Sequence, residues 1–268
     1  MADIGATQND KDVSVPFRFL RTYAARTTRS PRRLVLVTTV RPALDPALRH
    51  TIALRTEALF RSSGAFREGH FLLKSGRHGD AYVEKFQVLQ DPAATSELCG
   101  FFAEHGRAAD RELLVDLVAG PTTGGIILAF ETARQLGVRS IFAEEVRADD
   151  GTTHREFRRG FRIVPGERVL LVDDILTTGG SLLAMIPAVE AMGGEIVECV
   201  VLVDRGGGRT TLTSPSTGRV YAVRSLWELD LPTYEPGPAT CPRCADGTPL
   251  YAPGSTGTGS IAAGAAAS

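Results

Sequence analysis

The sequence of 268 residues has no apolar run that approaches the about 18 residues a membrane-spanning helix needs. This absence excludes a membrane protein, and we expect no membrane partner. The chain also lacks an excess of either charge, because 30 Lys and Arg residues face 31 Asp and Glu residues. A balanced total shows no polyanion-binding character, so we expect no nucleic-acid partner. With 43% hydrophobic and 23% charged residues, the composition is that of a globular chain of one large or two small domains.

Cysteines are few, and four in a chain of this length do not make a disulfide scaffold. Cys99 and Cys199 lie in apolar segments, which predicts core thiols. Cys241 and Cys244 form a lone CxxC, whereas a zinc site needs four ligands and the nearest histidine in sequence, His154, is far away. We therefore interpret the CxxC as a tight turn with unligated thiols; half of an intermolecular site and a redox pair are the alternatives. Nothing requires an oxidising compartment, so we expect a cytoplasmic protein.

Charge is unevenly distributed at the two ends of the chain. Residues 1–49 carry nine basic and four acidic residues, against 21 and 27 in the remainder. This Arg-rich, Ser- and Thr-bearing composition is typical of a transit peptide, although three aspartates near the N-terminus argue against one. An RNA-binding arm would need greater basic density and interleaved aromatics. We expect residues 1–49 to be a disordered Arg-rich extension, 50–251 the folded domain, and the uncharged residues 252–268 a flexible Gly/Ala/Ser tail.

Between these ends, short β-leaning runs alternate with segments of helical periodicity. The pattern predicts helices over 51–63, 93–105, 126–136 and 181–192, a hairpin over 71–83, and strands over 113–118, 140–143, 168–172 and 196–203. Such alternation is typical of an α/β fold with a parallel sheet covered by helices on both faces. Ligands of these sheets bind at the carboxyl ends of the strands, so the turns after each strand are the places where we expect the site.

The most informative of these turns follows the strand over 168–172. Asp173 and Asp174 come first, and hydroxyl residues and glycines over 177–181 then lead into a helix. Backbone N–H groups in a Gly-rich turn at a helix N-terminus bind anions, phosphate above all. The two carboxylates must face something else, such as hydroxyls or a cation. The turn lacks the Gly-Lys-Ser/Thr of a P-loop and the GxGxxG of a dinucleotide site, so a ribose 5-phosphate is the ligand that the pattern favours.

The segment 169–181 resembles the phosphoribosyl diphosphate (PRPP) signature of type I phosphoribosyltransferases. The segment 69–82 is similar to the N-terminal hood of orotate phosphoribosyltransferases, and 119–126 to the diphosphate-binding loop. Residues 203–208 resemble the Asp-Arg pair at the end of the strand that follows the PRPP signature in this family. Residues 231–244 resemble the C-terminal CPxC segment of some bacterial members. The resemblance covers about residues 53–251. It implies the type I phosphoribosyltransferase fold, with a central parallel sheet flanked by helices, a small N-terminal hood and a mobile loop.

The activity that the resemblance implies is a glycosyltransferase reaction. Orotate and Mg²⁺-PRPP would give orotidine 5′-monophosphate and diphosphate, a step of de novo pyrimidine biosynthesis. The family further implies Mg²⁺ as a cofactor, held mainly through PRPP, and a homodimer. Two alternatives stay open: a phosphoribosyltransferase for another base, and a PRPP-binding regulatory protein.

The resemblance also implies roles for individual residues. Asp173 and Asp174 would hold the ribose hydroxyls, close to the cationic charge that develops on the sugar. The remaining PRPP-binding positions would be Ile175, Leu176, Thr177, Thr178, Gly179, Gly180, Ser181, Lys74, Thr123 and Gly124. The orotate-binding positions would be Thr177, Arg205 and Tyr82, of which the arginine suits a carboxylate-bearing base.

One departure from the family concerns the mobile loop over 144–159. Many members carry an Arg-Lys pair, another lysine and a histidine there, whereas this loop starts with Glu144 and has no lysine. It carries Arg155, Arg158 and Arg159 instead. We expect Arg158 or Arg159 to supply catalytic cationic charge, across a dimer interface if the loop is shared between subunits. A solvated basic turn is the alternative.

Overall fold

The computed structural model describes residues 44–73, 75–253 and 260–261. Three parts of the predictions therefore lie outside the described residues: residues 1–43 of the expected extension, Lys74, and most of the expected tail. The chain divides into two units, Met1–Thr39 and Val40–Ser268, and the description below concerns the second. Among the residues described, no helix combines the length and the apolar character needed to cross a membrane.

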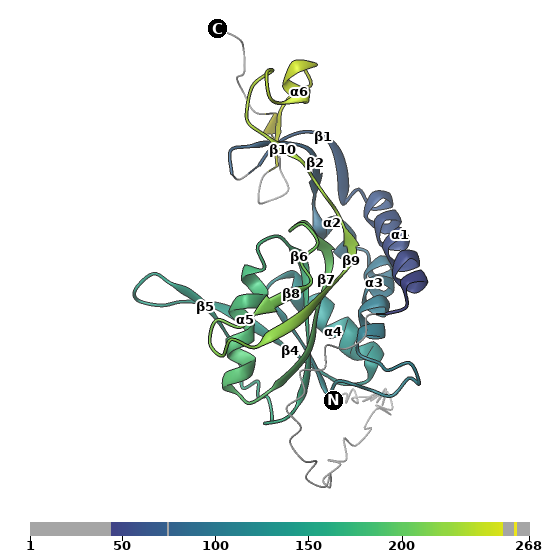
Figure 1. The fold of residues 1–268 in the computed structure, drawn as a ribbon, viewed down its shortest axis with the longest axis vertical. Helices are drawn as coiled ribbons and strands as arrows, with labels where there is room; N and C mark the ends of the chain where they lie inside the picture. The colour runs from purple at the N-terminus through teal and green to yellow at the C-terminus, as the bar shows by residue number, and fades with distance from the viewer. Residues whose placement is uncertain (1–43, 74, 254–259, 262–268) are drawn as a thin grey trace, which may run out of the picture. The chain divides into compact units, whose positions relative to one another are not determined.

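A seven-stranded sheet forms the larger part of this unit, in the order β5-β4-β3-β6-β7-β9-β8 (Figure 1). The five central strands are parallel to their neighbours, and the two outer strands are antiparallel. This confirms the predicted parallel α/β sheet, although β5, β8 and β9 were not among the predicted strands. The bounds are β3 Leu117–Pro121, β4 Arg139–Arg147, β5 Thr153–Glu156, β6 Arg168–Leu176, β7 Glu195–Asp204, β8 Thr211–Thr213 and β9 Val220–Glu228.

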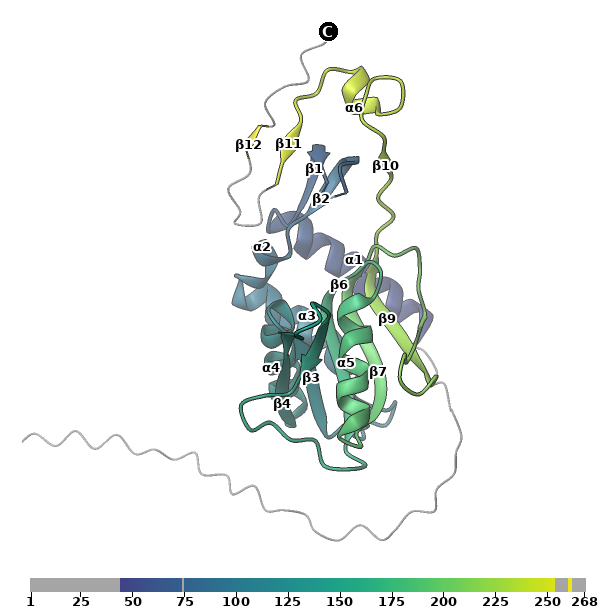
Figure 2. The ribbon, with the colours of Figure 1, turned by 90° about the vertical axis from the view of Figure 1, so that its left-hand side faces the viewer.

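Helices cover both faces of the sheet because the strands are apolar on both sides. On β6, Leu170 and Val172 join one buried cluster with helices α1, α3 and α4, whereas Val169 and Leu171 join a second cluster with α5. Figure 2 shows α5 running along strands β6 and β7. This alternation is the period of two that a strand imposes on its side chains. The helices are α1 Pro46–Ser62, α2 Lys85–Leu89, α3 Pro92–His105, α4 Gly124–Leu136 and α5 Gly180–Ala191.

Two helices begin with the same local signal, an aspartate followed by proline. The side chain of Asp45 accepts from the N–H groups of residues 47 and 48, and Asp91 does the same for residues 93 and 94. Proline then occupies the first helical position, where no N–H is needed. Because of this cap, α1 begins at Pro46 rather than at the expected residue 51. The helix therefore includes the last four residues of the expected extension over 1–49.

The hood is a second, smaller sheet. β1 (Phe66–Leu72) and β2 (His78–Val83) form the predicted antiparallel hairpin, with Leu72 opposite His78. The C-terminal segment returns to this hairpin: β10 (Thr233–Tyr234) pairs with β2, β11 (Tyr251–Ala252) with β1, and β12 (Ser260–Ile261) with β11. Between β10 and β11 lies the short helix α6, Pro242–Ala245 (Figure 1).

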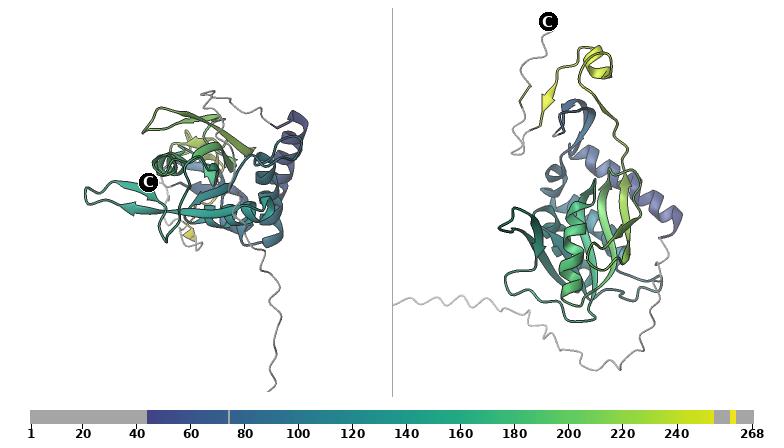
Figure 3. Two further views of the ribbon diagram at one scale, coloured as in Figure 1. Left: turned by 90° about the horizontal axis from the view of Figure 1, so that it is seen from below. Right: turned by 60° about the vertical axis from the view of Figure 1, so that its left-hand side comes forward.

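Three expected boundaries differ from the structure. The strand expected over 113–118 begins only at Leu117. The strand expected over 168–172 continues to Leu176, so both aspartates lie within β6 and not after it. The polar stretch from Glu144 is part of a hairpin, because β4 continues to Arg147 and pairs with β5. Figure 3 shows this hairpin projecting from the sheet.

Candidate active site

The end of β6 brings together the two elements that the sequence predicted, an acidic pair and an anion-binding turn. Asp173 and Asp174 are each only 6% exposed, and α5 begins at Gly180, close to the predicted start at 181. Gly179 has φ +83°, a left-handed conformation that favours glycine. The first N–H groups of α5 have no partner within the helix, so together they form an anion-binding turn.

The acidic pair is held by a lysine that sequence reasoning missed. Lys85 Nζ lies 2.6 Å from Asp174 Oδ2, so Asp174 carries a paired negative charge. Asp173 Oδ1 accepts from the N–H of Asp174, while burial and the charge of Asp174 raise the pKa of Asp173 to about 7. The Asp173 carboxyl is therefore partly protonated near neutral pH. No motif marks Lys85: it is the first residue of α2, and only the packing of α2 reveals its role.

The predicted diphosphate loop packs directly against this pair. A side chain at Gly124 would overlap Asp174 Oδ2, and one at Gly120 would overlap the backbone of Gly125. Thr123 is exposed at the start of α4. The glycines are therefore required by close packing, and they place the loop from β3 beside the turn from β6. The structure thus brings Thr123 and Gly124 to the aspartates, as the sequence predicted.

The three arginines of the β4–β5 segment occupy different places. Arg155 donates to Thr122 Oγ1 at 2.8 Å, its side chain is 10% exposed, and its charge acts to lower the pKa of Asp173. Arg158 is exposed and pairs with Glu156, and Arg159 is exposed and pairs with a glutamate of β4. The structure therefore places Arg155, and neither of the two predicted arginines, on the diphosphate loop. The catalytic role expected for Arg158 or Arg159 stays a prediction.

The three residues predicted to bind the orotate base lie in the same region of the fold. Arg205 follows β7 and its N–H donates to the carbonyl of Leu176 at 2.7 Å, which holds it beside Thr177. The charge of Arg205 acts on Tyr82 of the hood and opposes the burial that raises the pKa of this phenol. Burial lowers the pKa of Arg205, and its buried Nε has no hydrogen-bond partner among the described residues. A buried donor without a partner is a place where a ligand acceptor is favourable.

The other predicted PRPP-binding residues divide by exposure. Thr177, Thr178 and Gly180 are exposed, and Ser181 is half-buried, so their polar groups are accessible to a phosphate. Leu176 is buried and Ile175 is half-buried, so at these two positions the contribution to binding is expected from the backbone.

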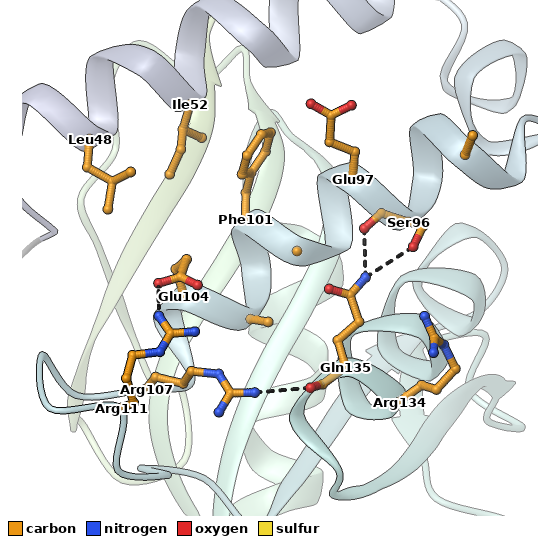
Figure 4. A pocket seen from close by; sticks show the side chains of 13 residues that line it. Leu48, Ile52, Ser96, Glu97, Phe101, Glu104, Arg107, Arg111, Arg134 and Gln135 are labelled. Carbon is orange, nitrogen blue, oxygen red and sulfur yellow. Dashed lines mark hydrogen bonds and ion pairs between the residues drawn. The ribbon is translucent and has the colours of Figure 1, made fainter.

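A cavity of about 950 Å³ lies elsewhere, between α1, α3 and the C-terminal end of α4 (Figure 4). Its lining includes Glu104, Arg107 and Gln135, and none of the predicted site residues. Asp174 packs at the first residue of α4, whereas the cavity is lined by Arg134 and Gln135 in the last turn of this helix, about 15 Å away along its axis. The cavity is thus separate from the strand ends.

Comparisons with known proteins agree with this geometry. Residues 87–215 match the family described as phosphoribosyl transferase domain. The orotate phosphoribosyltransferase of Caldicellulosiruptor bescii is 41% identical over 197 residues, which is 74% of this chain and 94% of the relative. The enzyme of Chlorobium phaeobacteroides is 42% identical over 197 residues, covering 74% and 93%. The crystal structure of orotate phosphoribosyltransferase from Aeropyrum pernix superposes with a TM-score of 0.52 at 27% identity, covering 64% of this chain and 92% of that one. The chain belongs to the orotate phosphoribosyltransferase family.

Proposed function

We propose that this protein transfers the 5-phosphoribosyl group of Mg²⁺-PRPP to orotate, giving orotidine 5′-monophosphate and diphosphate for pyrimidine synthesis. One observation carries the choice of base: the buried Nε of Arg205 has no partner among the described residues, while the backbone of Arg205 is bonded to Leu176, next to Thr177, and its charge acts on Tyr82. A guanidinium donates to a carboxylate through two parallel N–H groups. Orotate carries a carboxylate, whereas purine bases do not.

The turn after β6 supplies the ribose-phosphate site. The 5′-phosphate sits on the first N–H groups of α5, with the hydroxyls of Thr177, Thr178 and Ser181 as further donors. Asp174, whose charge Lys85 holds in place, accepts from a ribose hydroxyl. Asp173 is a proton donor to the ribose while its carboxyl is protonated, and an acceptor once it ionises.

The diphosphate leaves along the loop from β3. Mg²⁺ enters with PRPP, because no cage of three or more acidic side chains lies at the strand ends in the described part of the chain. When bound, the ion neutralises charge on the diphosphate and so favours its departure. Arg155, fixed to Thr122 of this loop, adds a cation at the same place.

The displacement breaks the bond from C1′ to the diphosphate and forms the bond from C1′ to the base. Positive charge develops on the ribose in this transition state, and the buried carboxylate of Asp174 is placed to stabilise it. Tyr82 lies against Phe71, with ring centroids 5.6 Å apart, and offers its other face to the pyrimidine. The protein's contribution is thus positioning and electrostatics.

The test of the proposed function is a substrate panel. With Mg²⁺-PRPP, we expect the loss of orotate absorbance and no turnover of adenine or hypoxanthine. Turnover of a purine but not of orotate would assign the protein to another base. PRPP binding without turnover of any base would identify a PRPP-binding regulator.

The acidic pair has its own test. Asp174→Asn keeps the shape of the side chain but loses the charge that pairs with Lys85. We expect kcat to fall by at least about 100-fold while the urea midpoint changes little. Unchanged activity in a folded variant would contradict the role given to Asp174.

We also propose that the enzyme is a cytoplasmic homodimer. Arg158 and Arg159 follow β5, the second strand of the projecting β4–β5 hairpin, and both side chains are exposed, so they can reach a second copy. None of the four cysteines forms a disulfide, as a reducing compartment favours. Sedimentation equilibrium tests the dimer. Mixing an Asp174→Asn chain with an Arg158→Ala/Arg159→Ala chain tests the shared loop: activity that rises on mixing supports it.

A further inference from the structure

Four side chains with metal-binding chemistry converge in the hood, away from the proposed active site. His70 lies on β1, His78 on β2, and Cys241 and Cys244 lie at the start of and within α6. Their nearest nitrogen and sulfur atoms are all within 4.8 Å of one another. The CxxC, interpreted from sequence as a tight turn with unligated thiols, spans the N-cap and the body of the short helix α6. His154 is the nearest histidine in sequence, but β1 and β2 bring two other histidines to the thiols across more than 160 residues.

The cluster is buried. Cys241 is 1% exposed, His70 4% and His78 5%, while Cys244 is half-buried. The two imidazole rings meet edge to face, with centroids 4.6 Å apart. Burying two imidazoles and two thiols costs more free energy than burying apolar side chains, so packing alone does not explain these residues. They are the usual ligand set of a structural zinc site.

The distances between ligand atoms match a tetrahedral ion. Cys241 Sγ and Cys244 Sγ each lie 3.6 Å from His70 Nε2, and Cys244 Sγ lies 3.3 Å from His78 Nδ1. Zinc bonds of about 2.3 Å to sulfur and about 2.0 Å to nitrogen place such atoms about 3.5 Å apart. His70 Nε2 and His78 Nδ1 are 2.8 Å apart, so they have to separate by about half an ångström, to the roughly 3.3 Å of two nitrogens on one tetrahedral ion.

The protonation of the cluster also suits a metal. His70 Nδ1 lies 2.8 Å from the carbonyl of Thr248, which can only accept, so Nδ1 carries the proton and Nε2 presents a lone pair to the cluster. Fixing the tautomer of a ligand in this way is typical of metal-bound histidines.

We propose that His70, His78, Cys241 and Cys244 bind one structural Zn²⁺ ion. Binding releases one proton from each thiol, and His78 carries its ring proton on Nε2. All four positions are filled by protein atoms, so the ion has no open position for substrate or water. The soft thiolates select zinc over the Mg²⁺ that accompanies PRPP.

The position of the site indicates its purpose. The ion joins the β1–β2 hairpin to the C-terminal segment, which other contacts also hold: Arg77 donates to Thr233, and β10 pairs with β2. β2 carries Tyr82 toward Arg205. Metal loss is therefore expected to loosen the hood and to raise KM for orotate. This last effect rests on the proposed function, whereas metal content does not.

The first experiment measures metal in the purified full-length chain, produced without a metal-affinity tag. We expect about one zinc per chain by elemental mass spectrometry. Cys244→Ser and His78→Ala should reduce the zinc content at least about tenfold. Cys99→Ala and His50→Gln are matched controls at a core thiol and at an exposed histidine of α1, and both should keep their zinc.

The second experiment does not depend on how well the variants fold. Zinc is removed from the wild-type protein with a chelator and replaced by Co²⁺, for which we expect a thiolate-to-metal charge-transfer band and the visible bands of a tetrahedral site. Re-addition of Zn²⁺ should abolish these bands and restore the melting temperature. Octahedral cobalt bands, a Cys241–Cys244 disulfide in the freshly purified protein, or a folded protein with free thiols that takes up no metal would each overturn the proposal.

Discussion

Replacing Asp173 by asparagine should stabilise the protein and inactivate it. Asp173 is 6% exposed, and burial together with the charge of Asp174 raises its pKa from 3.8 to about 7. Between these two pH values the folded protein holds a proton that the unfolded chain has released. The wild-type protein therefore loses stability as the pH rises through this window, and the loss is complete above about pH 7.

The size of this stability change follows from the raised pKa of Asp173. Each pKa unit corresponds to about 1.4 kcal/mol, and the window from pH 5 to pH 7 covers about two units. Asparagine does not ionise, and its oxygen can accept the same N–H of Asp174 that Asp173 accepts. The stability advantage of Asp173→Asn over wild type should therefore grow by about 2–3 kcal/mol from pH 5 to pH 7. It should then stay constant.

Urea unfolding of both proteins at half-unit steps from pH 5 to pH 8.5 measures this difference directly. Asp204→Asn is the matched control. Both carboxylate oxygens of Asp204 accept backbone N–H groups, from Gly206 and Arg209, so the substitution should destabilise the fold. An Asp173→Asn advantage that does not change with pH, or that shrinks as the pH rises, would refute the assignment of the buried proton.

Three further predictions concern substrate binding. Gly124→Ala places a methyl group against Asp174 and should lower kcat/KM for PRPP by about 100-fold with the fold retained, which circular dichroism checks. Arg205→Lys should raise KM for orotate by about tenfold or more and leave KM for PRPP within about twofold, because an ammonium cannot replace the bidentate fork; an equal rise in both constants would contradict the base-binding role. Arg155→Ala should reduce kcat by more than Arg158→Ala does in parallel steady-state assays, because Arg155 contacts the diphosphate loop and Arg158 pairs with Glu156 instead. A larger loss of kcat for Arg158→Ala would favour a β4–β5 loop that closes over the site or is shared between subunits.

Much of the fold followed from local pattern. The segment is apolar on both faces of β6, carries two aspartates near the end of the strand and runs into a Gly-rich helix start, so strand, turn and helix were all predictable from one short segment. The hairpin over β1 and β2 and the parallel sheet were likewise expected, whereas the order of the strands was not predicted. The approach of Thr123, Gly124 and Arg205 to this turn followed from their positions after neighbouring parallel strands.

What sequence reasoning missed depends on contacts between distant segments. Lys85 reaches Asp174 only because α2 packs at the strand ends, and no spacing rule connects the two residues. The histidines of the hood sit in a polar hairpin that bears no metal motif, and they meet the CxxC only because β10 and β11 return to that hairpin. The start of α1 was misplaced for a simpler reason, since the Asp45 cap and the following proline are a local signal that was not recognised.

The central claim is that this chain joins orotate to the ribose of PRPP at the end of β6. The most direct measurement follows orotate consumption and diphosphate release together in one reaction of purified protein with Mg²⁺-PRPP, and identifies the product by mass. We expect one diphosphate for each orotate consumed, orotidine 5′-monophosphate as the product, and the loss of both signals in folded Asp174→Asn. Diphosphate release without orotate consumption, or no turnover by a protein that binds PRPP, would contradict the account.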